Sequence, residues 1–375
     1  MSERCGSGRQ VPHLRQSISE ELSGADCAEC RRTGTISATM NTHNVAQHLI
    51  LTGSGFTANF GGLLTRDLWG RIFSRLSHEQ ILREVLLQQT NFEAAYGAVQ
   101  SGDYPQPTKD LMANATLEAF AELDERVKGW TWTPGSPYPV NEYALRKLIN
   151  RFSGASDRAS GFFFTLNQDF FVERVYCQDP GTEPLTIPGL ENPARLPLCS
   201  THMRTRGLPE GDFLLVPTNL DIARLEQQRS GFYYVKLHGS YGWKGQAARY
   251  PLVIGQNKGD AISGSELLSW YFRVFAAAIS AGNRRILIIG YGFGDAHVNQ
   301  ALGIAVRNNG LQLSVMTRST DNLIQTLRSR PDCKDVLEGL RNIYDEPMTS
   351  LYPANQEFTE GNRRLQQEFF GSVVR

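Results

Sequence analysis

The sequence lacks three features that would indicate a function class directly: an excess of one charge, a long apolar run and a dense set of cysteines. Its 38 basic and 38 acidic residues give a formal net charge of zero, so we expect no direct nucleic-acid binding and no attraction to anionic membranes. The most apolar stretch, 270–282, contains Arg273 and is shorter than the ~20 residues that cross a bilayer. The N-terminus has no apolar core of a secretory signal, and we therefore expect a cytoplasmic protein.

The cysteines are too few for a disulfide scaffold, with six in 375 residues. The one close pair, Cys27 and Cys30, suggests zinc, but a structural zinc site needs four ligands and no second pair follows. The pair lies in residues 1–40, a Ser-, Arg- and Gly-rich stretch without periodicity that we expect to be a disordered extension. We therefore predict no metal site.

The sequence does contain a repeated pattern: a short apolar run, then Gly, Asn, Asp or His, then residues with helical spacing. Near-continuous apolar strands are typical of a parallel sheet that is buried on both faces. The pattern predicts an α/β fold, with a Rossmann-like parallel sheet flanked by helices, in which ligands bind at the carboxyl ends of the strands. The runs lie at 45–53, 161–170, 231–243, 285–290 and 311–319.

Two long segments interrupt these strands. Residues 66–152 show helical periodicity and are expected to form a helical insertion, or second smaller domain. Residues 176–230 are rich in proline and are expected to be irregular. We predict a Rossmann domain over 41–320 that contains both insertions, followed by a C-terminal helical segment at 321–375.

The first candidate site is the stretch GSGFTA, which begins at Gly53 and fits the dinucleotide fingerprint G-x-G-x-x-G/A. In that interpretation Gly53 permits the tight turn, Gly55 lets the backbone approach a pyrophosphate, and the following helix contributes its positive end. The alternative is a sharp corner between a strand and a helix that binds nothing. A dehydrogenase is disfavoured, because no acidic residue ends a second strand about 20 residues later.

Two further candidate sites follow the next apolar runs. Asn167 and Asp169 could bind a carboxamide, a ribose hydroxyl or water, although such residues also often form turns that begin helices. His238, in the stretch KLHGS, could act as a general base near neutral pH, although a lone histidine at a strand end is more often structural.

The fourth candidate site is the stretch GYGFGD, which runs from Gly290 to Asp295 after another apolar run. Its alternating glycines could let a nucleotide approach the backbone, and Asp295 could bind a hydroxyl group. The alternative is a tight turn, with Tyr291 and Phe293 as core or ring-stacking residues.

These four motifs, in this order, resemble the sirtuin-like superfamily, and most closely its bacterial branch, whose members often act in anti-phage defence as NAD-degrading enzymes. The stretch GSGFTANFGG, with the LW and IF pairs that follow, looks like sirtuin-like proteins encoded beside a HerA-type ATPase. The likeness covers about 45–65, 161–175, 231–243 and 284–318. It does not cover the helical insertion or either end of the chain.

The resemblance implies an NAD+ glycohydrolase that releases nicotinamide and ADP-ribose, with NAD+ as substrate. It implies that Asn167 positions the carboxamide or water, that Asp169 holds the nicotinamide end, and that His238 is the catalytic base. It also implies a homo-oligomer and, as a possible partner, a HerA-type ATPase. The residues expected to bind NAD+ are Gly53, Ser54, Gly55, Phe56, Thr57, Asn59, Gly290, Tyr291, Gly292 and Asp295.

The sequence differs from those of protein-deacylating sirtuins at positions that bear on which reaction we expect. Those enzymes have glutamine where this chain has Leu166, and they carry two Cys-x-x-Cys pairs after the histidine, whereas this chain has no cysteine from 237 to 320. Recognition of an acylated peptide is therefore disfavoured. The alternatives are an NAD-dependent deacylase or ADP-ribosyl transferase, and a non-enzymatic nucleotide-sensing subunit of an ATPase complex.

Overall fold

The computed structural model describes residues 44–89, 91–128, 140–176, 183, 185–190, 214–215, 221–222, 231–244, 252–255, 258–356 and 358–371. The expected N-terminal extension, with Cys27 and Cys30, and most of the proline-rich segment 176–230 lie outside the described residues. No helix in the described part of the chain is long and apolar enough to cross a membrane.

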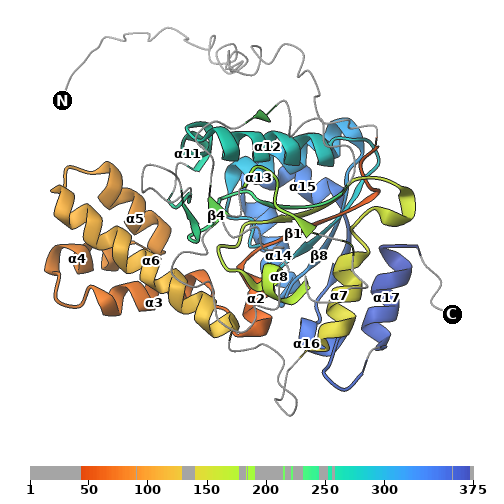
Figure 1. Cartoon of the computed structure of the whole chain (residues 1–375), viewed down its shortest axis with the longest axis horizontal. Coiled ribbons are helices and arrows are strands. Elements are labelled where there is room, and N and C mark those ends of the chain that lie inside the picture. The colour runs from red at the N-terminus through yellow and green to blue at the C-terminus, as the bar shows by residue number, and fades with distance from the viewer. Residues whose placement is uncertain are drawn as a thin grey trace, which may run out of the picture. The chain divides into compact units, whose positions relative to one another are not determined.

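The centre of the fold is a seven-stranded sheet in which every pair of neighbouring strands is parallel (Figure 1). The strand order is β3-β5-β2-β1-β7-β8-β9. This arrangement confirms the predicted Rossmann-like α/β fold. The strands are β1 (His48–Thr52), β2 (Gly161–Thr165), β3 (Leu185–Thr186), β5 (Phe232–Lys236), β7 (Arg285–Ile289), β8 (Gln312–Met316) and β9 (Leu340–Tyr344).

The apolar runs form central strands because both faces of the sheet are covered. In β2, successive phenylalanines contact different helices: the Phe164 ring lies 5.0 Å from Phe275, and the Phe163 ring lies 6.3 Å from Phe56. Phe275 belongs to α12 (Glu266–Ile279), and Phe56 belongs to α2 (Ser54–Thr57). Burial on both faces explains why these strands show no alternation of polar and apolar residues.

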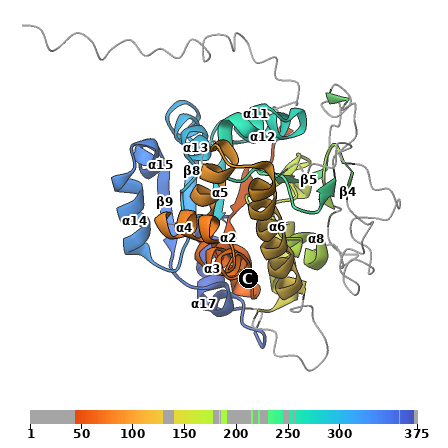
Figure 2. The same cartoon turned by 90° about the vertical axis from the view of Figure 1, so that its left-hand side faces the viewer.

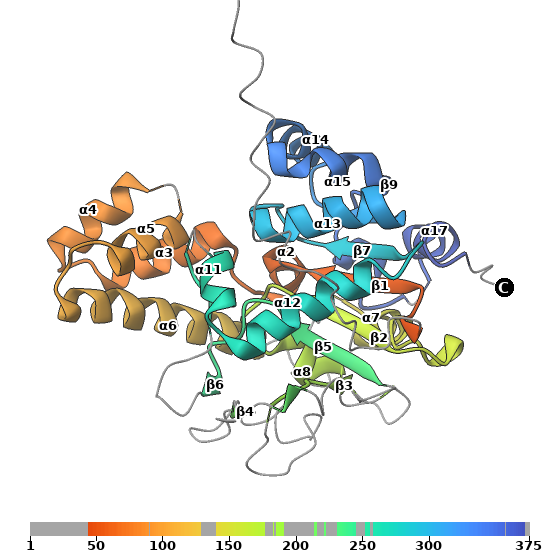
Figure 3. The same cartoon turned by 90° about the horizontal axis from the view of Figure 1, so that it is seen from above.

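The first part of the helical insertion has its own apolar core. Four helices, α3 (Thr65–Arg75), α4 (Gln80–Gln88), α5 (Phe92–Ser101) and α6 (Gln106–Lys128), pack around one cluster beside the sheet (Figures 1 and 3). A fifth helix, α7 (Glu142–Asn150), instead packs into the core of the sheet through Leu145 and Leu148. Residues 66–152 therefore contribute to two separate cores.

The C-terminal segment, expected to be helical, also contributes an edge strand of the sheet. It contains α14 (Thr320–Ser329), α15 (Lys334–Gly339), β9, α16 (Met348–Leu351) and α17 (Glu360–Glu368). β9 was not predicted because its LRNIY sequence places polar residues in the middle, and only Tyr344 is buried. Figure 2 shows β9 beside β8, with α14 and α15 at this edge of the sheet.

The remaining described elements, apart from α13, are short. A separate two-stranded sheet pairs β4 (Leu214–Leu215) with β6 (Trp243–Lys244). α8 (Phe171–Val175) follows β2, α11 (Lys258–Ser263) precedes α12, and α13 (Ala296–Asn309) follows β7. Single turns of 3-10 helix lie at Ala58–Phe60, Ala155–Asp157 and Pro331–Cys333.

Candidate functional site

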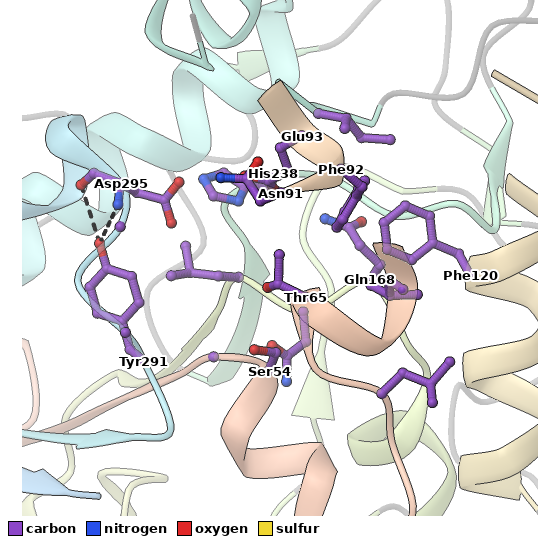
Figure 4. Close-up of a pocket in the computed structure, with 18 of the residues that line it drawn as sticks. Ser54, Thr65, Asn91, Phe92, Glu93, Phe120, Gln168, His238, Tyr291 and Asp295 are labelled. Atoms are coloured by element: carbon purple, nitrogen blue, oxygen red, sulfur yellow. Dashed lines mark hydrogen bonds between the residues drawn. The ribbon is translucent and has the colours of Figure 1, made fainter. Parts of the chain in front are cut away.

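A cavity of about 440 Å³ lies at the carboxyl ends of β1, β2, β5 and β7. Parallel strands bring the segments that follow them to the same edge of a sheet, so motifs far apart in the sequence meet here. Figure 4 shows residues from these segments around the cavity. Each of the four predicted motifs contributes to its lining, through Gly53, Ser54 and Thr57, through Asn167 and Asp169, through His238, and through Tyr291, Gly292 and Asp295.

The glycines of the first and fourth motifs pack directly against each other. The Gly55 N–H donates a hydrogen bond to the carbonyl of Gly290 at 2.9 Å, and the Gly53 N–H donates to Ile289 at 3.0 Å. A methyl group on Gly55 would lie 2.7 Å from the Cα of Gly290. A methyl group on Gly290, where φ is +64°, would lie 2.2 Å from the Phe56 nitrogen. Contact between the two loops therefore requires glycine at these positions.

Not every residue expected to bind NAD+ lines this cavity. Phe56 is buried in an aromatic cluster, with its ring 5.8 Å from Phe171. Asn59 donates from Nδ2 to the carbonyl of Gly55 at 2.8 Å. The helix after Gly53 is only the four residues of α2, so it offers a much smaller dipole than a full helix.

A second cavity, of about 200 Å³, adjoins the first. Its lining includes Gly55, Asn59 and Gly290 from the predicted motifs, together with Arg318 and Glu346. Tyr291 and Gly292 line both cavities. A methyl group on Gly292 would meet no atom within 4 Å. Unlike Gly290, Gly292 therefore borders open space where the two cavities meet.

The loop after β2 lines the first cavity and contains buried polar atoms without partners in the described part of the chain. Asn167 donates from Nδ2 to the Thr57 hydroxyl at 3.4 Å, and Asp169 Oδ1 accepts from the Phe171 N–H at 3.0 Å. Asp169 therefore also forms the turn that precedes α8. Its Oδ2 atom and the Oε1 atom of Gln168 are buried without a hydrogen-bond partner among the described residues.

A buried lysine holds this loop in place. Lys236 is 0% exposed, donates to the carbonyl of Asp169, and forms an ion pair with Glu173 at 2.7 Å. Burial raises the pKa of both Asp169 and Glu173, and the Lys236 ammonium opposes that effect. The Ser240 hydroxyl donates to the carbonyl of Gln168 at 2.9 Å. Residues on either side of His238 thus support the Asn167 loop.

His238 is 3% exposed, and its Nε2 atom lies 3.2 Å from Nε2 of His297. Burial lowers the pKa of His238 to about 3, and the charge of Lys258 acts in the same direction. The imidazole is therefore neutral at physiological pH. Because Nε2 faces His297, Nδ1 is the ring nitrogen left for a substrate group.

A chain of charged groups borders His238. Lys258 of α11 forms ion pairs with Asp295 at 2.7 Å and with Glu93 of α5 at 2.9 Å. Burial favours the neutral carboxyl of Asp295, but the attraction of His238, which is protonated only in acid, and of Lys258 outweighs it and lowers the pKa to about 2. Asp295 is therefore ionised, and its carboxylate is already paired with an ammonium group.

Tyr291 fixes the fourth motif. Its hydroxyl accepts a hydrogen bond from the Asp295 N–H at 3.1 Å, drawn in Figure 4, and donates to Asn299 Oδ1 at 2.9 Å. These bonds tie the loop to the first turns of α13. The hydroxyl therefore has a structural role, while other atoms of Tyr291 line the cavities.

Several lining residues were not predicted from the sequence. Lys258 and Glu93 lie in no motif and are brought to the site by the packing of α11 and α5. Asp124 of α6 accepts the Phe170 N–H at 3.0 Å, so the insertion also contacts the Asn167 loop. The helical periodicity of residues 66–152 predicted helices there, but it did not show which helix face borders the cavity. The unpredicted lining residues include Thr65, Leu68, Asn91, Phe92, Glu93, Phe120, Leu123, Gln168, Lys258 and Arg330.

One group of side chains has the donor types of a metal site. Atoms of His238, Asp295 and His297 lie within 4.8 Å of one another. However, the Lys258 ammonium is bonded to Asp295, and a divalent cation would be repelled by it. We assign no metal here, and the absence of a metal stays a prediction.

No model of a known protein family matches this chain, and no curated protein matches its sequence.

Proposed function

We propose that this protein is an NAD+ glycohydrolase, which uses water to cleave NAD+ into nicotinamide and ADP-ribose. The observation that supports this proposal best is the convergence of four separate strand-end motifs on one cavity, in the order that resembles sirtuin-like proteins. A second cavity that adjoins the first at Tyr291 and Gly292 provides room for the other half of a dinucleotide.

The chemistry of the lining suits the two ends of NAD+. A nicotinamide carboxamide donates two hydrogen bonds and accepts others, which complements the amide of Asn167 and the carboxyl group of Asp169 in the lining. The pyrophosphate needs positive charge, which Arg318 in the second cavity can contribute, whereas Arg330 in the first is paired with Asp332. Glu346 in the second cavity can accept hydrogen bonds from ribose hydroxyls.

The proposed reaction breaks the bond between the ribose anomeric carbon and the nicotinamide nitrogen. The bonding electrons leave with nicotinamide, which departs as a neutral molecule and needs no general acid. A water oxygen attaches to the oxocarbenium-like carbon, and its proton passes to Nδ1 of His238. Asn167 positions the carboxamide or the water, and buried polar groups of this kind are effective because they are already oriented.

The resemblance supports further proposals about the protein's setting. We infer a cytoplasmic role in bacterial defence against phage, in which NAD+ is depleted, and a homo-oligomer that works with a HerA-type ATPase. A deacylase would consume NAD+ only in the presence of an acylated peptide, and a sensing subunit would bind NAD+ without cleaving it. These differences make the reaction type directly testable.

The test is NAD+ consumption by the pure full-length chain, with products identified by mass spectrometry. The parent protein should release nicotinamide without any peptide. Asn167→Ala and His238→Ala should each lower the rate at least ~10²-fold, as expected for loss of positioning or general-base catalysis. Gly70→Ala is a matched control, since a methyl there meets no atom within 4 Å, and it should retain the parental rate. If Asn167→Ala or His238→Ala retains the parental rate, the site assignment is wrong.

A further inference from the structure

His297 was not part of the predicted site, yet it is the residue whose ring directly meets that of His238. The two Nε2 atoms are 3.2 Å apart, and the ring centroids are 5.3 Å apart. His297 is held in the first turn of α13 and by the Phe272 ring of α12, at 5.4 Å. It is half-buried, whereas His238 is fully buried.

The two imidazoles border different cavities. His238 lines the 440 Å³ cavity, and His297 lines a third cavity of about 430 Å³. Glu93, Lys258 and Asp295 line both. The two cavities therefore share charged residues, and the contact between the two imidazoles links the proposed reaction site to the third cavity.

The contact restricts where the ring protons can be. Two neutral imidazoles whose Nε2 atoms form a hydrogen bond need one N–H donor and one lone pair. If His238 is to accept a proton from water, its Nδ1 must carry the lone pair, so its proton is on Nε2. His297 must then accept at Nε2 and carry its own proton on Nδ1.

We propose that His297 is a positioning residue that fixes the tautomer of His238 and receives the Nε2 proton of His238 when His238 takes a proton from the attacking water. This inference rests on the proposed function. The water proton binds to Nδ1 of His238, and the proton on Nε2 moves to Nε2 of His297. His297 then releases its Nδ1 proton toward the third cavity. One proton enters the pair and one leaves, so its charge is unchanged, no electrons are transferred, and both tautomers are exchanged. After the products leave, the reverse shift restores the starting tautomers: His297 takes up a proton at Nδ1, its Nε2 proton returns to Nε2 of His238, and His238 loses its Nδ1 proton to water in the emptied cavity.

Burial, the largest effect on both rings, lowers the pKa of both and so favours release of a proton from the pair over its retention. Lys258 also disfavours a cation on His238, whereas Asp295 favours one. The charged and titratable groups facing the pair are Lys258 from α11, Glu93 from α5, and Asp295 at the start of α13. Asp295 raises the pKa of His297, while burial, the largest effect, and Lys258 lower it. Because His297 is the more exposed ring, it can lose its proton to solvent more easily than His238.

The tautomers can be measured without any reaction. We would record ¹⁵N NMR spectra of the full-length protein with labelled histidine, and assign His238 and His297 by substitution. The proposal predicts Nε2–H on His238 and Nδ1–H on His297. Nδ1–H on His238, or lone pairs on both Nε2 atoms, as a bridging metal would require, overturns it. If the tautomers are as predicted but the parent protein does not cleave NAD+, the proposed function fails and the pairing stands.

The relay itself is tested by substitution and chemical rescue. His297→Ala should lower kcat at least tenfold with little change in KM, and added imidazole should restore part of kcat. His297→Gln can accept from the Nε2–H of His238 but cannot pass a proton onward, so it should keep the His238 tautomer with a low kcat. Gln300→Ala alters an exposed residue that lines the same cavity and should leave kcat unchanged. Parental kcat in both His297 variants, or no effect of imidazole on His297→Ala, overturns the relay.

Discussion

The glycine-rich loops and the polar loop after β2 line the same cavity, but their residue types have different physical explanations. Gly55 and Gly290 are glycines because their backbones touch. Asp169 and Gln168, in contrast, keep buried polar atoms without partners among the described residues, at the lining of the cavity. The comparison shows that the motif most like a nucleotide fingerprint is explained largely by packing, while the less specific polar residues carry the stronger evidence for a ligand.

The largest effect should come from a side chain placed between the glycine loops. Gly290→Ala would require a left-handed residue with its methyl 2.2 Å from the Phe56 nitrogen, and should cost more than about 4 kcal/mol of stability or prevent folding. At Gly292, an added methyl group would meet no atom within 4 Å. We therefore expect the unfolding free energy of Gly292→Ala to lie within ~1 kcal/mol of the parental value. Urea denaturation of both variants measures the difference. Equal stability of the two would show that packing does not explain Gly290.

A slightly smaller effect is expected beneath the polar loop. Lys236→Met would leave Glu173 and the Asp169 carbonyl buried without their shared donor, at a cost of about 3–5 kcal/mol. Denaturant titration would measure this loss. The double variant Lys236→Met with Glu173→Met removes both charges and should recover part of the stability. A single variant as stable as the parent would mean that the ion pair does not support the loop.

The pH dependence of the unfolding free energy tests whether His238 is buried as a neutral imidazole. Its pKa is lowered from 6.5 to about 3 in the folded protein, so the unfolded chain binds more protons as the pH falls below 6.5. This contribution to stability is complete above pH 6.5 and decreases toward pH 3, by up to about 1.4 kcal/mol per pH unit. The parent protein minus His238→Asn difference in unfolding free energy should shrink by about 2 kcal/mol between pH 8 and 5. No change in that difference would contradict a buried neutral imidazole.

Gly292→Ala should change stability least but weaken NAD+ binding measurably. Gly292→Ala adds one methyl group where the first and second cavities meet. We expect it to weaken NAD+ binding about tenfold, since it narrows the passage that the dinucleotide would occupy, while folding is unchanged. Isothermal titration at a temperature where turnover is slow measures the affinity. Unchanged affinity would place the dinucleotide away from Gly292.

The sequence allowed the sheet to be predicted, with the four motifs at the ends of its strands, because apolar runs and strand-end residues are local patterns. It did not allow β9 to be predicted, since an edge strand with a polar centre lacks that pattern. Lys258 and Glu93 could not be found because only tertiary packing brings them to His238. His297 was missed although it lies two residues after Asp295, because it falls just outside the glycine-rich motif. The contact between Gly55 and Gly290 could not be predicted either, because the fingerprint gives the spacing of the glycines but not which backbone segment packs against them.

NAD+ glycohydrolysis is tested most directly by incubating the pure protein with NAD+ in H₂¹⁸O and analysing the products by mass spectrometry. We expect equal amounts of free nicotinamide and ADP-ribose carrying one ¹⁸O atom, formed without any peptide acceptor. NAD+ that stays intact with the purified, folded chain, or ADP-ribose that appears only on an acceptor, would contradict it.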